Sequence, residues 1–166
     1  LQRSGRVGEA EVALQQSIDM LHELGDARAA ASFVGSLGGL FYSQGQTGLA
    51  ERAHEKALSL HREFGNRRYE GVALGNLAMV RYHTGRLAQA ERDYEEAIAI
   101  FREVRDRHST AIALGNLAAL YQASGRLDRA RESHERSLAV FRELGDRTLE
   151  GVVLGNIAQL HKMKGQ

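Results

Sequence analysis

A 40-residue period constrains the fold of this chain more than any other feature of its sequence. One twelve-residue segment occurs three times with changes: LGNLAMVRYHTG begins at Leu74, LGNLAALYQASG at Leu114 and LGNIAQLHKMKG at Leu154. The same spacing holds in three further series, which are Gly5, Gly45, Gly85, Gly125 and Gly165, then Gly25, Gly65, Arg105 and Gly145, then Ala10, Ala50, Ala90 and Ala130. A fixed period of this length is typical of repeat proteins, whose units pack against their neighbours.

The sequence of each 40-residue unit predicts two helices joined by short turns. Within residues 106–145 the apolar positions form two stripes with helical spacing, the first Leu114, Leu117, Ala118 and Tyr121, the second Leu127, Ala130, His134, Leu138, Phe141 and Leu144. Gly125 and Gly145 follow the stripes, and we expect both in the left-handed conformation that ends helices. The predicted N-caps, which occupy one place in successive units, are Asp26, Asn66, Asp106 and Asp146.

One such hairpin cannot bury both of its apolar stripes, so the units must stack. Small residues recur where helices of the stack have to approach closely: Ala78, Ala118 and Ala158 on the first helices, Ala50, Ala90 and Ala130 on the second. The sequence therefore predicts an all-α solenoid of antiparallel helix hairpins. We expect one array, divided into a partial repeat at 1–25 (a second helix), full repeats at 26–65, 66–105 and 106–145, and a partial repeat at 146–166 (a first helix).

The two incomplete ends predict a fragment of a longer array that associates with itself head to tail. The residues that would lack a hairpin partner are Val12, Leu14, Ile18 and Leu21 at one end and Leu154, Ile157 and Leu160 at the other. Contact between the ends of two molecules would complete a hairpin and would propagate without closing.

Five positions of the unit carry a family resemblance, namely Leu117, Ala118, Tyr121, Gly125 and Ala130. Their order and spacing resemble the tetratricopeptide repeat, whose usual unit has ~34 residues. The longer unit resembles the repeats of the Partner-of-Inscuteable adaptors and of bacterial regulators and signal-transduction ATPases. The resemblance covers the whole chain and implies a right-handed superhelix whose first helices line a concave, peptide-binding face. The departures are Arg81 and His161 at the Tyr121 position, Arg105 in place of Gly, Ser36 in place of Asn, and His54 and His134 at an aromatic position.

Composition excludes several classes of protein. The 22 basic and 21 acidic residues give a formal net charge of +1, so no basic excess indicates a nucleic-acid partner. The chain has no Cys, which excludes disulfides, thiol catalysis and Cys-ligated zinc. No run of about 18 apolar residues predicts a membrane span, and no signal peptide is recognisable. We expect a cytoplasmic protein without cofactor or metal.

The candidate catalytic motifs are incomplete, so we expect no enzyme. His54 and Glu55 begin a segment like HExxH, but Leu58 stands where the second His must be. Ser36 is not part of a G-x-S-x-G elbow, because Val34 replaces the first Gly and no strand is predicted. Two exposed (i, i+4) pairs, Arg92 with Glu96 and Glu132 with Arg136, are interpreted as solubilising charges.

The asparagine of each repeated segment is the best candidate for ligand binding. Asn76, Asn116 and Asn156 lie off the core stripe of the first helices, each beside a glycine. The family resemblance implies that they hydrogen-bond the backbone of a bound peptide. A primary amide both donates and accepts, and the adjacent glycine keeps the wall of the groove low. The alternative is a hydrogen bond between adjacent first helices, and an amide has the capacity for both.

Side chains that differ between repeats surround each asparagine and predict a sequence-selective site. The other candidate peptide-binding residues are Ser36, Arg68, Val72, Met79, Tyr82, His83, His108, Ile112 and Gln122, with Arg28, Ser32, Gly39, Tyr42 and Ala119 near them. Arg68 and His83 suggest an acidic group on the ligand. We therefore predict a scaffold that binds a peptide segment of a partner protein in the concave face. The alternatives are a structural or self-assembling spacer and the peptide-sensing domain of a bacterial regulator.

Overall fold

The computed structural model describes residues 2–163 and 165, with side chains described at 8–163 and 165. This part of the chain forms eight α-helices and no strand, which confirms the all-α prediction. The helices are α1 (Gln2–Glu23), α2 (Ala27–Ser43), α3 (Thr47–Glu63), α4 (Arg67–His83), α5 (Leu87–Glu103), α6 (Arg107–Ala123), α7 (Leu127–Leu144) and α8 (Arg147–Met163).

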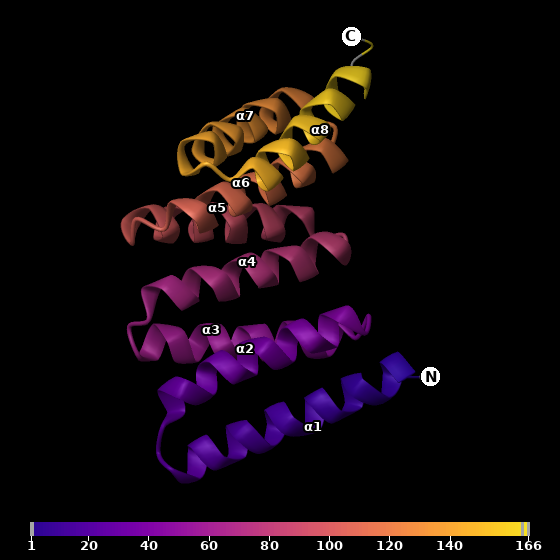
Figure 1. Cartoon of the computed structure of the whole chain (residues 1–166). Coiled ribbons are helices and arrows are strands. Elements are labelled where there is room, and N and C mark those ends of the chain that lie inside the picture. Colours follow the sequence, from indigo (N-terminus) through magenta and orange to yellow (C-terminus); the bar gives the residue numbers. More distant parts are fainter. Residues whose placement is uncertain (1, 164, 166) are drawn as a thin grey trace.

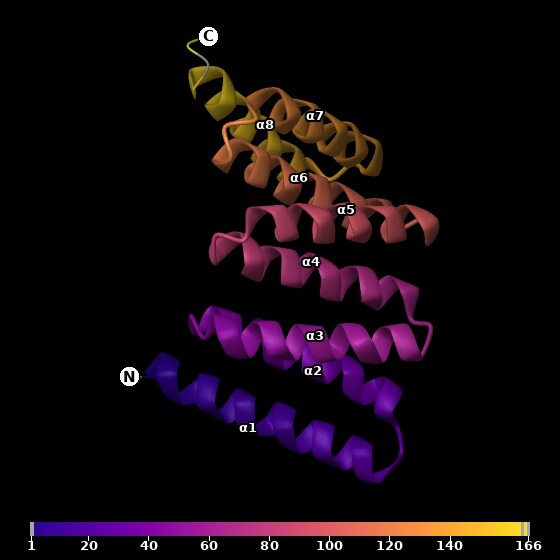
Figure 2. The same ribbon diagram turned by 180° about the vertical axis from the view of Figure 1, so that it is seen from behind.

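The helices stack as a solenoid with two layers. In Figure 1, α2 and α8 lie in front of α3 and α7, and Figure 2 shows the reverse order from behind. Each helix packs against the next one in sequence, and α4 also contacts α2 and α6. We call the surface formed by α2, α4, α6 and α8 the first-helix face. The first and last helices, α1 and α8, lie at opposite ends of the stack (Figure 1).

The same turn joins every pair of consecutive helices. After α6 the Gly125 N–H donates to the Gln122 carbonyl (3.1 Å) and the Arg126 N–H to the Tyr121 carbonyl (2.8 Å), with Gly125 at φ 73°. This is the left-handed helix end predicted for Gly125 and Gly145. Arg105 is the one residue other than glycine with positive φ (57°) in the described part of the chain. A left-handed conformation costs a residue with a Cβ roughly 1–2 kcal/mol.

Three of the four predicted N-caps form the expected side-chain hydrogen bond. The carboxylates of Asp26, Asp106 and Asp146 accept hydrogen bonds from backbone N–H groups three residues later, at 2.9–3.0 Å. Asn66 is the N-cap residue of α4, as predicted, but its side chain makes no cap hydrogen bond, although its backbone (φ −85°, ψ 70°) resembles that of Asp106. A carboxylate forms the stronger, charge-assisted bond, and the neutral amide lacks that advantage.

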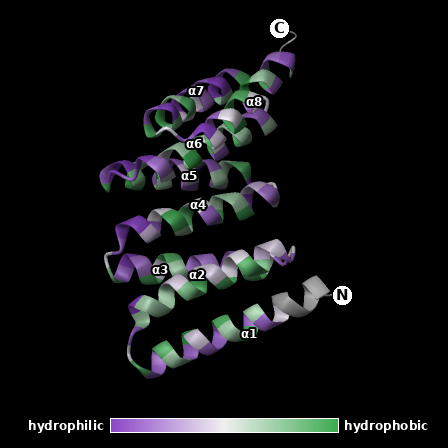
Figure 3. Cartoon of the chain, in the orientation of Figure 1, coloured by the Kyte–Doolittle hydropathy of each residue, from purple (hydrophilic) through white to green (hydrophobic). Residues whose placement is uncertain are grey.

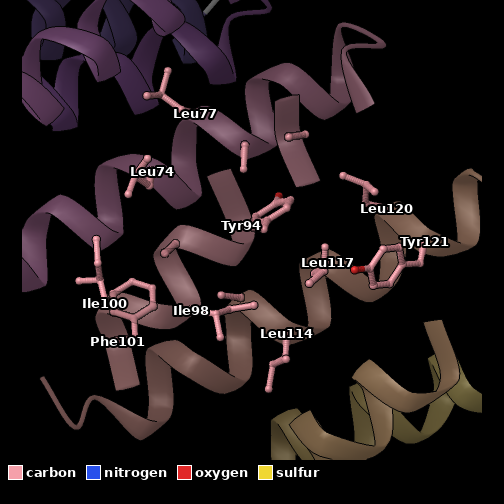
Figure 4. Packing of buried hydrophobic residues seen from close by; sticks show 14 of the residues in the cluster. Leu74, Leu77, Tyr94, Ile98, Ile100, Phe101, Leu114, Leu117, Leu120 and Tyr121 are labelled. Carbon is pink, nitrogen blue, oxygen red and sulfur yellow. The ribbon is translucent and has the colours of Figure 1, made fainter. Parts of the chain in front are cut away.

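The largest core cluster is centred on α4, α5 and α6, whose labelled side chains Figure 4 shows, and extends to Leu58 on α3, Ala130 on α7 and Leu160 on α8. The first predicted stripe, which is Leu114, Leu117, Ala118 and Tyr121, is buried throughout. The second stripe is buried at Ala130, His134, Leu138 and Phe141. Leu144 does not belong to it: this last residue of α7 is 43% exposed, because the chain turns away at Gly145.

Small residues lie where helices meet, as predicted. Ala50, Ala78, Ala90, Ala118 and Ala130 are all fully buried. The exception is Ala158, which is exposed because no helix packs beyond α8 in the described residues.

The outermost helices are more covered than the sequence suggests. Ile18 on α1 and Leu160 on α8, which were predicted to lack a hairpin partner, are nevertheless buried, because helices of the neighbouring repeats cover them. Val12 and Leu154 remain exposed. Figure 3 shows apolar and polar segments mixed along each helix, and no helix among the described residues is long and apolar enough to cross a membrane.

Candidate functional site

The asparagines of the repeated segments lie on the first-helix face, Asn76 on α4, Asn116 on α6 and Asn156 on α8. Asn116 is exposed and the other two are half-buried. Within the described part of the chain, none of the three amides forms a hydrogen bond, so the bond between adjacent first helices that was the alternative is not formed. Each amide retains its full capacity to donate and accept.

Two hollows on this face lie between neighbouring first helices. One, of about 210 Å³, lies between α4 and α6 and is lined by Val72, Gly75, Asn76, Met79, Tyr94, Phe101, Ser109, Ile112, Ala113 and Asn116. The other, of about 440 Å³, lies between α2 and α4 and is lined by Ser32, Gly35, Ser36, Gly39, His54, Ala57, His61, Tyr69, Val72, Ala73 and Asn76. Val72 and Asn76 line both hollows. Six of the candidate residues therefore line these two hollows, namely Ser36, Val72, Asn76, Met79, Ile112 and Asn116. In the hollow between α4 and α6, the apolar Val72, Met79 and Ile112 lie beside two free amides.

The glycine beside each asparagine leaves the site open. A Cβ placed on Gly75 would have no atom within 4 Å, and the same holds for Gly155. Gly115 is almost as open, since its nearest neighbour would be the Ser137 Oγ at 3.8 Å. The low wall predicted for the groove is thus present at Asn76, Asn116 and Asn156.

Arg68 and His108, which occupy the same place in successive repeats, are held by the cap residue of the following repeat. The Arg68 Nε donates to the Asp106 carboxylate at 2.7 Å, and the His108 Nε2 lies 3.5 Å from the Asp146 carboxylate. Burial raises the pKa of Asp106, but hydrogen bonds from Ser109 and Arg68 outweigh it and lower the pKa. Arg68 is therefore paired within the chain, so an acidic ligand group would have to share or replace Asp106 as its partner.

Tyr82, His83 and Gln122 lie at the far end of their helices. His83 contacts Tyr82 and Tyr42 with its ring, at centroid distances of 4.9 and 5.7 Å, and the Gln122 Nε2 lies 3.2 Å from the Met163 Sδ. Arg68 and His83 are at opposite ends of α4, about 22 Å apart at ~1.5 Å per residue. A ligand that contacted both residues would therefore have to run along most of the length of α4, and the acidic-group hypothesis stays a prediction.

Three histidines are buried, and sequence reasoning anticipated two of them as packing residues. His54 and His134 are 1% exposed, and neither ring nitrogen of either has a hydrogen-bond partner. Burial lowers the pKa of His54 to about 4 and also lowers that of His134. His61, which stacks on Tyr69, was missed; burial lowers its pKa and Glu70 opposes the shift. Among the described residues, no group of side chains is arranged to hold a metal ion.

Ion pairs between repeats were also missed by sequence reasoning. Arg81, at the Tyr121 position, is half-buried and its guanidinium binds Asp93 (2.6 Å), Glu55 (3.1 Å) and Glu51 (3.3 Å). Of the two predicted surface pairs, Glu132 and Arg136 lie 3.9 Å apart. The prediction for the other pair is wrong, because Glu96 binds Arg62 at 2.6 Å. The sequence did contain a signal for such ion pairs: Glu51 and Glu91 lie one period of 40 apart, and so do their partners Arg86 and Arg126.

Comparison with known proteins agrees with this architecture. The family model described as "Tetratricopeptide repeat" matches residues 28–103, 69–143 and 109–166. No curated protein matches the sequence.

Three solved structures illustrate the likeness in fold. BtubC (BKLC) from P. vanneervenii has a TM-score of 0.89 at 25% identity, over 99% of this chain and 68% of that one. The apo form of RapI has a TM-score of 0.87 at 17% identity, over 98% of this chain and 60% of that one. The first TPR of Spaghetti (RPAP3), bound to the HSP90 peptide SRMEEVD, has a TM-score of 0.64 at 20% identity, over 82% of this chain and 94% of that one.

Proposed function

The chain belongs to the tetratricopeptide repeat family, and from that premise we propose that it binds a peptide segment of a partner protein along the concave first-helix face. The observation that carries the proposal is the pair of unbonded amides, Asn76 and Asn116, that line the hollow between α4 and α6. The proposed role is a binding one and not an enzymatic one, in a cytoplasmic setting.

The chemistry of the hollow suits a peptide. An amide side chain can pair with the N–H and the carbonyl of a peptide group whatever the ligand sequence, so the asparagines supply binding that does not depend on sequence. Val72, Met79 and Ile112 supply apolar contact beside them, and Ile112 is 41% exposed. Solved structures of the same fold include one with a bound peptide, which supports the proposal at the level of the fold.

A direct test starts from a displayed library of random peptides. Peptides selected on the native chain are measured by calorimetry on the native chain and on an Asn76→Ala/Asn116→Ala double variant. Each lost hydrogen bond contributes about 0.5–1.5 kcal/mol, so binding should weaken roughly 5- to 150-fold. Asn66→Ala is the matched control, because Asn66 is an asparagine of the same helix region whose side chain makes no cap hydrogen bond.

A loss in binding could come from the missing contacts with the peptide or from a less stable fold, and thermal unfolding by circular dichroism separates the two. We expect the double variant to melt within a few degrees of the native chain, because its amides form no hydrogen bond in the described structure. If selected peptides bind the double variant and the native chain equally, the asparagines do not form the site.

Head-to-tail self-association is the second candidate function. It is favoured by apolar residues that remain exposed on the outermost helices, namely Val12 and Met20 on α1 and Val152 and Leu154 on α8. Sedimentation of the native chain and of an Ile157→Lys variant tests it, since a charge on the outer helix would oppose association. A native chain that stays monomeric at high concentration, with no effect of the added charge, would exclude this function.

A further inference from the structure

A pocket of about 400 Å³ opens between α5, α6 and α7, and none of the asparagines lines it. Its lining consists of the arginines Arg102, Arg105, Arg107 and Arg136, the apolar Phe101, Leu114 and Val140, and Thr110. No acidic side chain is among the described residues that line it. The side chains of four arginines and an apolar floor therefore surround a space that no acidic residue among the described residues lines.

The neighbouring repeats show what normally occupies the equivalent place. In one, the Glu70 carboxylate accepts from the Arg62 Nε (2.9 Å) and the Arg67 Nη1 (2.6 Å), and its side chain is buried. In the other, Glu150 is buried in the same way between Arg142 (3.0 Å) and Arg147 (2.8 Å). A buried carboxylate between two arginines therefore joins the second helix of one repeat to the first helix of the next at α3–α4 and at α7–α8, whereas Ala30 stands at the equivalent place between α1 and α2.

The middle repeat keeps the arginines and lacks the carboxylate. Arg102 and Arg107 stand one period of 40 after Arg62 and Arg67, but Thr110 stands where Glu70 would recur. Arg107 pairs with Glu143. Arg102 forms no ion pair or hydrogen bond with any residue that the structure describes.

Two further substitutions add positive charge at the same pocket. Glu96, the second partner of Arg62, is replaced one period later by Arg136. Arg105 stands where the other repeats have Gly25, Gly65 and Gly145, and it adopts their left-handed conformation at φ 57°. Its guanidinium also has no partner within the described residues. Of the four arginines, Arg102 and Arg105 have no partner within the described residues, whereas Arg107 pairs with Glu143 and Arg136 lies 3.9 Å from Glu132. A strained residue beside such a pocket points to a functional role.

We propose that this pocket binds an oxyanion, a phosphate or a carboxylate, that is carried on an apolar stem and takes the place that Glu70 and Glu150 fill in the neighbouring repeats. Guanidinium forks bind such oxygens with two parallel hydrogen bonds, and the floor of Phe101, Leu114 and Val140 receives the stem. The volume lies in the range of small-ligand sites, roughly 300–1,000 Å³. This site is distinct from the peptide face proposed above and does not depend on it.

The test uses small probes on the isotope-labelled chain at low ionic strength, where charge–charge attraction is least screened. Phenyl phosphate and benzoate separate the two oxyanions, while inorganic phosphate and phenol present the charge and the stem alone. We expect phenyl phosphate or benzoate to shift the backbone amide resonances of residues 102–110 and 136–140 saturably. Either should bind more tightly than inorganic phosphate and phenol do.

Four variants make the assignment specific. Arg102→Gln should weaken binding about tenfold, which corresponds to about 1.4 kcal/mol. Arg105→Gly should weaken binding while melting no lower than the native chain, because glycine accepts the left-handed conformation. Thr110→Glu should abolish binding, because its own carboxylate would occupy the arginines as Glu70 does. Arg52→Gln, an exposed arginine on α3, is the matched control and should change nothing.

Several results would overturn the proposal. Binding that survives Thr110→Glu, or that Arg52→Gln weakens as much as Arg102→Gln, would show adventitious attraction to arginine in general. Absence of any saturable shift with the four probes would also refute it. If inorganic phosphate bound as tightly as phenyl phosphate, the apolar stem would be wrong.

Discussion

The buried imidazole of His54 should make this stack less stable in mild acid. The side chain is 1% exposed, both ring nitrogens lack partners, and burial lowers its pKa from the ordinary 6.5 to about 4. As the pH falls below 6.5, the unfolded chain takes up a proton that the folded chain excludes, so the stabilisation present above pH 6.5 is lost down to about pH 4. That difference in pKa corresponds to about 3 kcal/mol, at about 1.4 kcal/mol per unit.

His54→Phe isolates this contribution. The next repeat has the aromatic Tyr94 at the equivalent position, and Phe fills the space without a titratable group. We expect the free energy of unfolding, measured by urea titration at pH values from 7.5 to 4, to fall less steeply for the variant than for the native chain. The buried His61 and His134 contribute part of the pH dependence of the unfolding free energy in both proteins. The exposed His83→Phe serves as control, and parallel curves for the native chain and His54→Phe would refute the reasoning.

Two further substitutions test the packing. Leu117→Ala should lower the free energy of unfolding by about 2–5 kcal/mol, through the cavity it leaves in the central cluster. Hydrogen exchange should show lost protection in α6 and its neighbours but not in α2. A uniform loss along the chain would contradict a stack in which repeats contact only their neighbours. Gly38→Ala should destabilise by about 1–3 kcal/mol in chemical denaturation, because its Cβ would lie 2.7 Å from the His54 ring. Gly39→Ala, which meets open space, should stabilise the helix, and equal effects of the two would show that the close contact is not limiting.

The fold was readable from the sequence because local and repeating signals agree. The stripe that includes Leu114 and Leu117, the left-handed Gly125 and the Asp106 cap all depend on residues within one helix or turn. The exception at Asn66 has the same local nature: the position was right and only the hydrogen bond was not formed.

The contacts of the candidate site were less predictable, because they depend on how one repeat sits on the next. Arg68 binds Asp106, which lies 38 residues later, and no pattern within one helix indicates that pairing. Arg81 stands at an aromatic position, yet it lies within reach of acids from α3 and α5. The family resemblance implied that Asn76 and Asn116 line a groove, and both lie beside one hollow between α4 and α6; their role in binding stays a proposal.

The repeated junction between second and first helices has a mechanical consequence. Glu70 joins α3 to α4 and Glu150 joins α7 to α8, whereas Thr110 provides no such bridge between α5 and α6. Under tension along the stack axis, the junctions act as springs in series, and their compliances add. Elongation and bending then concentrate at the junctions without this bridge, which are α5–α6 and also α1–α2, where Ala30 stands in the place of Glu70.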